Sequence, residues 1–131
     1  MSNEYGYRTT LELPYEAAIE KTTAALKAEG FGVLTEIDVQ ATLKKKLDAD
    51  FRRYVILGAC NPKLAHQALQ SELEVGLLLP CNVIVYETGD GQSTVSIVNP
   101  LAMLGVVDSP ALTNVANEAQ TRLQRVIQAL S

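Results

Sequence analysis

The sequence predicts an α+β fold, in which a largely antiparallel sheet has helices packed on one face. Two observations lead to this prediction. Segments with strand periodicity first alternate with segments of helical periodicity, but residues 81–87 and 93–98 are two strand-like segments in direct succession. Between them, the Gly-Asp-Gly of "TGDGQ" supplies the positive φ that a tight hairpin connection needs. A hairpin makes the strands that it joins antiparallel.

Five segments are predicted to be strands because they alternate or are continuously apolar. These segments are residues 4–13, 31–39, 52–60, 81–87 and 93–98. In the second, Val33, Thr35 and Ile37 alternate with their neighbours, which is typical of a half-buried strand. The third, "RRYVILGAC", is apolar throughout its middle, so we expect it to be a central strand.

Four helices are predicted, each opening at a capping residue or at a proline in the first turn. Their starts are Pro14, Asp38, Asn61-Pro62 and Ser109-Pro110. Gly30 is placed to end the first helix, and the last has apolar residues at threes and fours up to Leu130. Residues 99–107 are predicted to be an apolar connector with one helical turn.

Composition excludes several classes of function. The 131 residues, 47% of them hydrophobic and without repeat or linker, fit one domain over residues 1–131. A net charge of −4 argues against nucleic-acid binding, which needs a dominant basic face. The chain lacks a run of 18 apolar residues and a signal-peptide pattern, so we expect no membrane association and a cytoplasmic location. The two cysteines are then expected to be free thiols.

The candidate site consists of two Cys–Asn pairs, each beside a proline. They are Cys60-Asn61-Pro62 and Pro80-Cys81-Asn82. Cys60 precedes a helix start, where the partial positive charge of the helix is expected to lower its pKa. If the strands that end at Cys60 and begin at Cys81 run antiparallel, the two residues lie at one edge of the sheet. In the alternative interpretation, both are small buried hydrophobes.

His66, the single histidine, lies between the two pairs at the margin of an apolar helix face. Two thiols and an imidazole suit Zn(II), Cu(I) or a reversible disulfide, so Cys60, Cys81 and His66 form an alternative metal set. The spacing matches no known metal motif, and our main expectation is that the protein has no cofactor. A boundary residue with wetted ring nitrogens is the other interpretation of His66.

The chain resembles a bacterial family called domain of unknown function 302 over essentially its whole length. The pattern is Gly-x-x-Asn-Pro after the third strand and Leu-Pro before the hairpin, present here as Gly58, Asn61, Pro62, Leu79 and Pro80. The resemblance implies a fold like one half of the TATA-binding protein, with a curved antiparallel sheet and helices on one side. It also implies a small homodimer, and it implies no activity.

Two hypotheses follow, with a non-enzymatic module favoured over an enzyme. In the first, the protein is a binding or interaction module, a homodimer whose apolar pocket or interface takes a small apolar ligand or a protein partner. The apolar connections 76–80 and 101–107 motivate it, since exposed apolar connections mark interfaces. In the second, Cys60 and Cys81 carry persulfide or disulfide chemistry or bind a soft metal. Cys60, Asn61, His66, Cys81 and Asn82 are the candidate binding residues.

Overall fold

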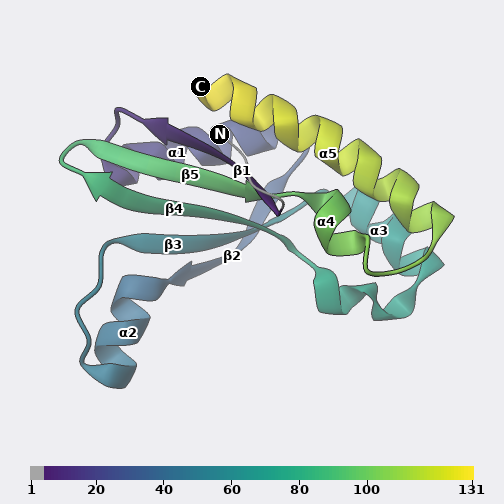
Figure 1. Cartoon of the computed structure of the whole chain (residues 1–131), viewed down its shortest axis with the longest axis horizontal. Helices are drawn as coiled ribbons and strands as arrows, with labels where there is room; N and C mark the ends of the chain where they lie inside the picture. Colours follow the sequence, from purple (N-terminus) through teal and green to yellow (C-terminus); the bar gives the residue numbers. More distant parts are fainter. Residues whose placement is uncertain (1–4) are drawn as a thin grey trace.

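The structure, a computed structural model, describes residues 5–131 and confirms the α+β fold (Figure 1). Its strands are β1 (Gly6–Leu11), β2 (Gly32–Asp38), β3 (Tyr54–Cys60), β4 (Cys81–Gly89) and β5 (Gln92–Val98). Its helices are α1 (Tyr15–Ala28), α2 (Val39–Leu47), α3 (Pro62–Ser71), the 3₁₀ helix η1 (Leu73–Leu78), α4 (Pro100–Leu104) and α5 (Pro110–Leu130). Residues 1–4 lie outside the described residues. Two predictions fall partly on them: the start of the first strand at residue 4, and the absence of a signal-peptide pattern at the N-terminus.

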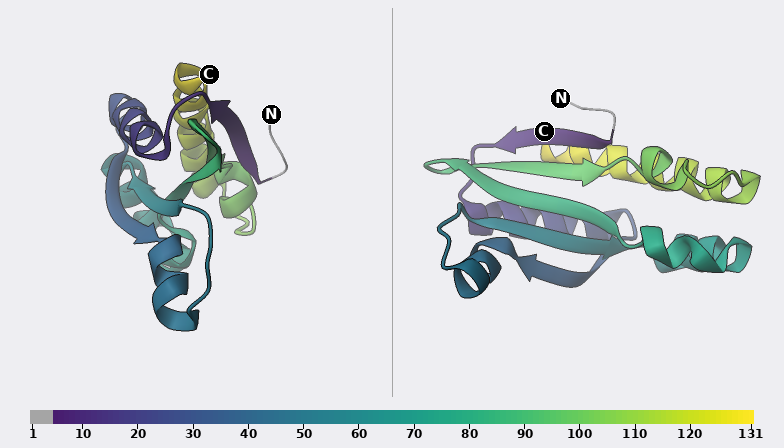
Figure 2. Two further views of the ribbon diagram at one scale, coloured as in Figure 1. Left: turned by 90° about the vertical axis from the view of Figure 1, so that its left-hand side faces the viewer. Right: turned by 60° about the horizontal axis from the view of Figure 1, so that its bottom comes forward.

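The sheet has the order β1-β5-β4-β3-β2, and each neighbouring pair is antiparallel. This confirms the antiparallel prediction, including the hairpin between β4 and β5. The predicted third strand, β3, is interior, but the central position belongs to β4. The sheet curves around α1 and α5, which cover the same face (Figure 2, left).

The main core lies between this face and the two long helices. On β3, β4 and β5, every second side chain is buried, and the register aligns them across the strands: Leu57 pairs with Val83, and Val83 pairs with Ile97. Leu26 of α1 and Leu123 of α5 are completely buried against this layer. Burying a leucine stabilises the fold by about 1.5–3 kcal/mol, so the face covered by the helices contributes most to the stability of this half of the molecule.

Three predicted helix caps are confirmed. Asp38 accepts a hydrogen bond from the Ala41 amide at 2.9 Å, and Asn61 and Ser109 make the equivalent bonds at the starts of α3 and α5. Pro14 was expected inside the first turn but is the N-cap of α1, one position earlier, with extended backbone. A proline satisfies both positions, because neither needs its missing N–H.

The edge strand β2 differs from its prediction as a half-buried strand. Its side chains are mostly exposed, and its register shifts between Val33 and Thr35 as it pairs with β3. Every residue of β2 after Val33 is exposed, before and after the shift, so alternation in the sequence did not report burial on this edge strand. The helix α2 that follows has no buried residue, and Leu47 at its end is 71% exposed.

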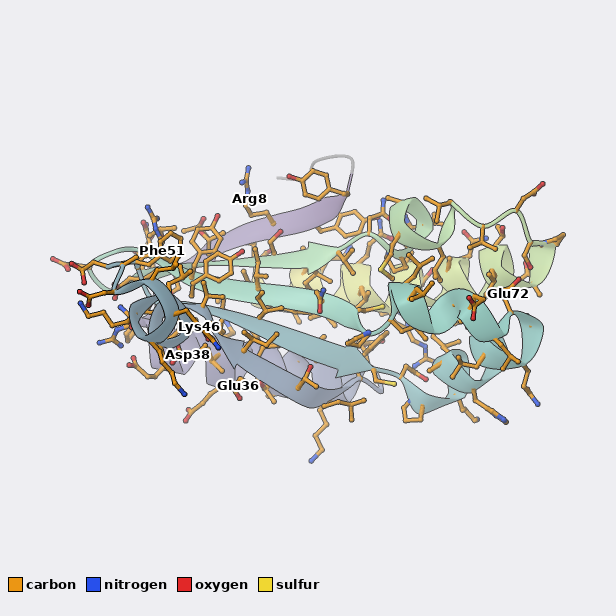
Figure 3. The ribbon with its side chains drawn as sticks, turned by 90° about the horizontal axis from the view of Figure 1, so that it is seen from below. Arg8, Glu36, Asp38, Lys46, Phe51 and Glu72 are labelled. Atoms are coloured by element: carbon orange, nitrogen blue, oxygen red, sulfur yellow. The ribbon has the colours of Figure 1, made fainter. Side chains whose placement is uncertain are left out.

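The opposite end of the molecule carries a second, smaller apolar cluster. It lies beyond the strand ends, where α3, η1, α4 and the first half of α5 meet, and includes Ala68, Val75, Leu104 and Leu112. Figure 3 shows how far apart the two ends are, with Lys46 and Phe51 near α2 and Glu72 at the junction of α3 and η1. Within residues 5–131, no helix has the length and apolar character needed to span a membrane.

Candidate ligand-binding cavity

A cavity of about 360 Å³ lies at the end of the sheet, between the main core and the second cluster. Its walls come from β2, β3, α3, η1 and the segment after it, β4, α4 and α5. They include Phe31, Thr35, Cys60, Asn61, Leu64, Ala65, Ala68, Leu79, Pro80, Cys81, Leu104, Val115 and Ala119. None of the described residues that line it is charged. Cavities of this size and character hold small apolar molecules in proteins.

The cavity exists because the β3–β4 ladder stops while the helices continue beyond it. Ala59 pairs with Cys81 as the last pair of that ladder. Beyond this pair, β3 leads into α3 and β4 is preceded by η1, so the two segments no longer pair as strands (Figure 2, right). Helix α5 continues past the strand ends and places Val115 and Ala119 over the opening.

Both cysteines line this cavity, although they belong to opposite faces of the sheet. Cys81 opposes Ala59 on the face covered by the helices, and neighbouring residues of a strand point to opposite faces, so Cys60 belongs to the other. Thr35 and Pro80, which also line the cavity, lie against Gly58 on the Cys60 side. The cavity therefore wraps around the end of the sheet and reaches both cysteines.

The prediction that the two cysteines lie at one edge within about two strand spacings is confirmed by the register. Opposed Cα atoms are about 4.5–5.5 Å apart and one residue along the strand adds about 3.4 Å, so the Cys60 and Cys81 Cα atoms are separated by about 6 Å. Both thiols are free.

The predicted lowering of the Cys60 pKa is wrong. Burial raises the pKa of the Cys60 thiol, and burial together with the charge of Cys60 raises that of Cys81 to about 11. The partial positive charge of the α3 start is already partly neutralised, because the Asn61 side chain accepts from the Leu64 amide at 3.2 Å. Loss of solvation therefore determines the direction, and both thiols are protonated at neutral pH.

Asn61 both caps α3 and lines the cavity. Besides capping α3, its side chain lies beside Gly30, where an added Cβ would come within 3.0 Å of the Asn61 amide nitrogen. Gly30 has φ of +84°, a left-handed conformation that glycine adopts without strain. Asn61 thus lies beside the turn after α1, at the start of α3, and forms part of the cavity wall.

His66 and Asn82 do not join the cavity. His66 is exposed on α3, and Asn82 is exposed on β4 opposite Gly58. Across residues 5–131 there is no group of three or more His, Cys, Asp and Glu side chains placed to hold a metal ion. The structure therefore brings together Cys60, Asn61 and Cys81 of the predicted site residues.

Most of the lining residues were not recognised from the sequence as a site. Leu64, Ala65 and Ala68 have the spacing of a helix packing stripe in the sequence, although they line the cavity. A weaker signal was present in the apolar connections, since Leu79 and Leu104 both line it. Packing stripes and cavity walls have the same composition, so sequence does not separate them.

A second, polar groove of about 840 Å³ runs between α3 and α5 and includes Lys63, Glu118 and Arg122. Arg122 donates to the Glu118 carboxylate at 2.8 Å and to the Glu29 carbonyl at 3.1 Å. These contacts use two of the five N–H donors of the guanidinium, and the Glu118 carboxylate offsets its charge.

The comparisons with known proteins define the class of this protein. A family model described as "Domain of unknown function DUF302" matches residues 7–130. The chain belongs to this DUF302 family, as its Asn-Pro and Leu-Pro pattern predicted. It is also similar to a solved structure, the crystal structure of the uncharacterized conserved protein DUF302 from Bacillus stearothermophilus. That similarity has 32% sequence identity and a TM-score of 0.88 and covers 98% of this chain and 100% of the other. No curated protein matches the chain.

Proposed function

We propose that this protein is a non-enzymatic binding module that holds a small apolar ligand in the cavity between its two apolar clusters. One observation carries the proposal: apolar side chains make up most of the cavity walls, and none of the described lining residues is charged. The cavity is partly open to solvent, so its apolar walls are exposed to water when it is empty. A ligand that fills the cavity removes this apolar surface from water, which favours binding.

The lining also sets the character of the ligand. Thr35, Asn61 and the two thiols contribute the few polar atoms, and Asn61 already uses its carbonyl oxygen in the α3 cap. A charged ligand would lose its hydration without gaining a charged partner. The ligand class is therefore neutral and mainly apolar.

Binding of N-phenyl-1-naphthylamine, a neutral fluorophore that brightens in apolar surroundings, tests the proposal. We expect saturable binding with one molecule per chain. The variant Ala65→Leu adds three carbon atoms to the wall and displaces about two CH₂ groups of ligand contact, which weakens binding about tenfold. Ala24→Leu is the matched control, since Ala24 is an exposed alanine on α1 away from the cavity.

Both variants replace alanine by another good helix former, so a difference between them reports the cavity and not helix stability. Absence of saturable fluorescence in the unmodified protein would refute the proposal. So would equal binding by the two variants.

We also propose that the protein forms a homodimer through the end of the molecule that holds the cavity. Leu73 and Leu77 of η1 and Val106 after α4 are 82%, 83% and 75% exposed. Leu77 and Val106 lie within the two apolar connections that motivated the dimer prediction, and Leu73 precedes the first of them. Exposed apolar side chains of this kind support an interaction surface.

Persulfide or disulfide chemistry at Cys60 and Cys81 has less support. The nucleophile in such reactions is the thiolate, and the raised pKa values of both groups keep the thiolate population low at neutral pH.

A further inference from the structure

We propose that the ligand of the cavity is a neutral amphiphile, whose apolar chain lies in the cavity and whose hydroxyl-bearing head group lies in the polar groove between α3 and α5. The inference rests on the proposed function, because it assigns a chemical class to the ligand of the same cavity. It adds a second binding region, which a purely apolar molecule would leave unused.

The cavity and the polar groove adjoin each other at a shared wall. Asn61, Leu64 and Val115 line both spaces, so the two spaces meet at these side chains. Leu64 comes from the first turn of α3, and Val115 comes from the first half of α5. A molecule that occupies both spaces therefore has to pass only this wall.

Two side-chain amides give the polar groove much of its character. Gln67 of α3 and Asn114 of α5 line the groove from opposite helices, and both are exposed. Within residues 5–131 neither side-chain amide makes a hydrogen bond. An amide side chain both donates and accepts, and so does a hydroxyl group, so a hydroxyl-bearing head group can pair with either amide.

Two nitrogen donors face the part of the groove beside Gly30. A Cβ added to Gly30 would lie 3.0 Å from Asn61 Nδ2 and 3.6 Å from Arg122 Nη1, and the glycine leaves this space open. Asn61 accepts from the Leu64 amide through its oxygen, so its Nδ2 remains available to donate. Because Asn61 lines both spaces, this donor lies where the chain and the head group of an amphiphile would join.

The charges of the groove favour a neutral head group over an ion. Arg122 and Glu118 form an ion pair at 2.8 Å, so their charges offset each other. Lys63 is the remaining cation of the described lining, and it is exposed. An exposed ion pair contributes little to binding, so a carboxylate head group would gain little from Lys63 while sharing the groove with the Glu118 carboxylate.

The volume of the cavity sets the length of the apolar chain. An apolar cavity of about 150 Å³ accommodates benzene. The cavity of about 360 Å³ therefore has room for a chain of about ten carbon atoms. The groove of about 840 Å³ has ample room for a head group with several hydroxyl groups.

Two esters with the same apolar chain test the inference on the full-length protein. Glycerol monodecanoate and methyl decanoate share the chain and the ester group, and only the first has hydroxyl groups. We expect glycerol monodecanoate to displace N-phenyl-1-naphthylamine at about a tenfold lower concentration, because its hydroxyl groups bond to the amides of the groove. Decanoate supplies a charged head group on the same chain and should displace the fluorophore less well than glycerol monodecanoate.

A matched pair of double variants locates the head group. Gln67→Ala/Asn114→Ala should lose the preference for glycerol monodecanoate but still bind the fluorophore, since neither residue lines the cavity. Gln70→Ala/Asn117→Ala changes the same residue types three positions further along the same helices, at exposed sites outside the groove, and should keep the preference. Alanine is the best helix former, so both double variants preserve α3 and α5.

The outcomes separate the two proposals. If the fluorophore binds but both esters displace it equally, or if decanoate displaces it best, the cavity function stands and the head-group inference falls. The inference also falls if the two double variants keep the preference equally, or if glycerol monodecanoate binds without displacing the fluorophore. If neither the fluorophore nor the esters bind, both proposals fall.

Discussion

Gly58 is a position at which the structure leaves no room for a side chain. It lies on β3, and a Cβ added there would come within 2.1 Å of the Thr35 hydroxyl oxygen and 2.8 Å of the Pro80 ring. Both distances are well below an ordinary contact of about 3.5–4.0 Å. Thr35 and Pro80 line the cavity, so the glycine permits the close approach that builds this wall.

Gly58→Ala is therefore expected to destabilise the protein. Thr35 is exposed and can move partly, but the Pro80 ring is rigid and directly precedes β4. Overpacking by one methyl group costs about 1–3 kcal/mol, and the lower entropy of the unfolded chain offsets about 0.4–1 kcal/mol of it. The net loss is about 1–2 kcal/mol, which thermal or urea unfolding resolves as a melting temperature lowered by several degrees.

Gly32→Ala provides the control on the neighbouring strand, because a Cβ at Gly32 meets no atom within 4 Å. We expect it to be neutral or slightly stabilising. In the double variant Thr35→Ala/Gly58→Ala the hydroxyl contact is gone and the Pro80 contact remains, so part of the stability should return. Equal unfolding free energies for the two single glycine variants would show that the close approach at Gly58 does not exist.

Three further predictions concern the cap, the thiols and the dimer. Asn61→Ala should lower the unfolding free energy by about 1 kcal/mol in urea titration, because it removes the bond to the Leu64 amide, and an unchanged value would show that the cap contributes nothing. The pKa of Cys81 is raised from 9.0 to about 11, so the protonated thiol stabilises the fold below pH 9. That contribution, about 2–3 kcal/mol, should be lost between pH 9 and 11 and be absent in Cys81→Ala, which urea unfolding across this range checks. Light scattering should give twice the 14.2 kDa chain mass, and Leu77→Glu should halve it while Leu47→Glu, equally drastic but on α2, should not. A mass of 14.2 kDa for the unmodified protein at every concentration would reject the dimer.

The sequence by itself determined the local structure. Capping residues such as Asp38, Asn61 and Ser109 act on amides three residues away, so their roles follow from a few adjacent letters. The hairpin around Gly91, which has φ of +66°, is equally local. From these elements and the family pattern, the antiparallel arrangement of the strands and the proximity of the two cysteines could be predicted.

Tertiary structure alone decided what surrounds those cysteines. Their pKa values are raised because packing removes water from them, and no local signal in the sequence reports that loss of solvation. The same packing leaves His66 exposed and turns the stripe of Leu64 and Ala68 into a cavity wall. A cavity is a gap between elements distant along the chain, so it is fixed by where α5 lies over the strand ends and not by any single segment.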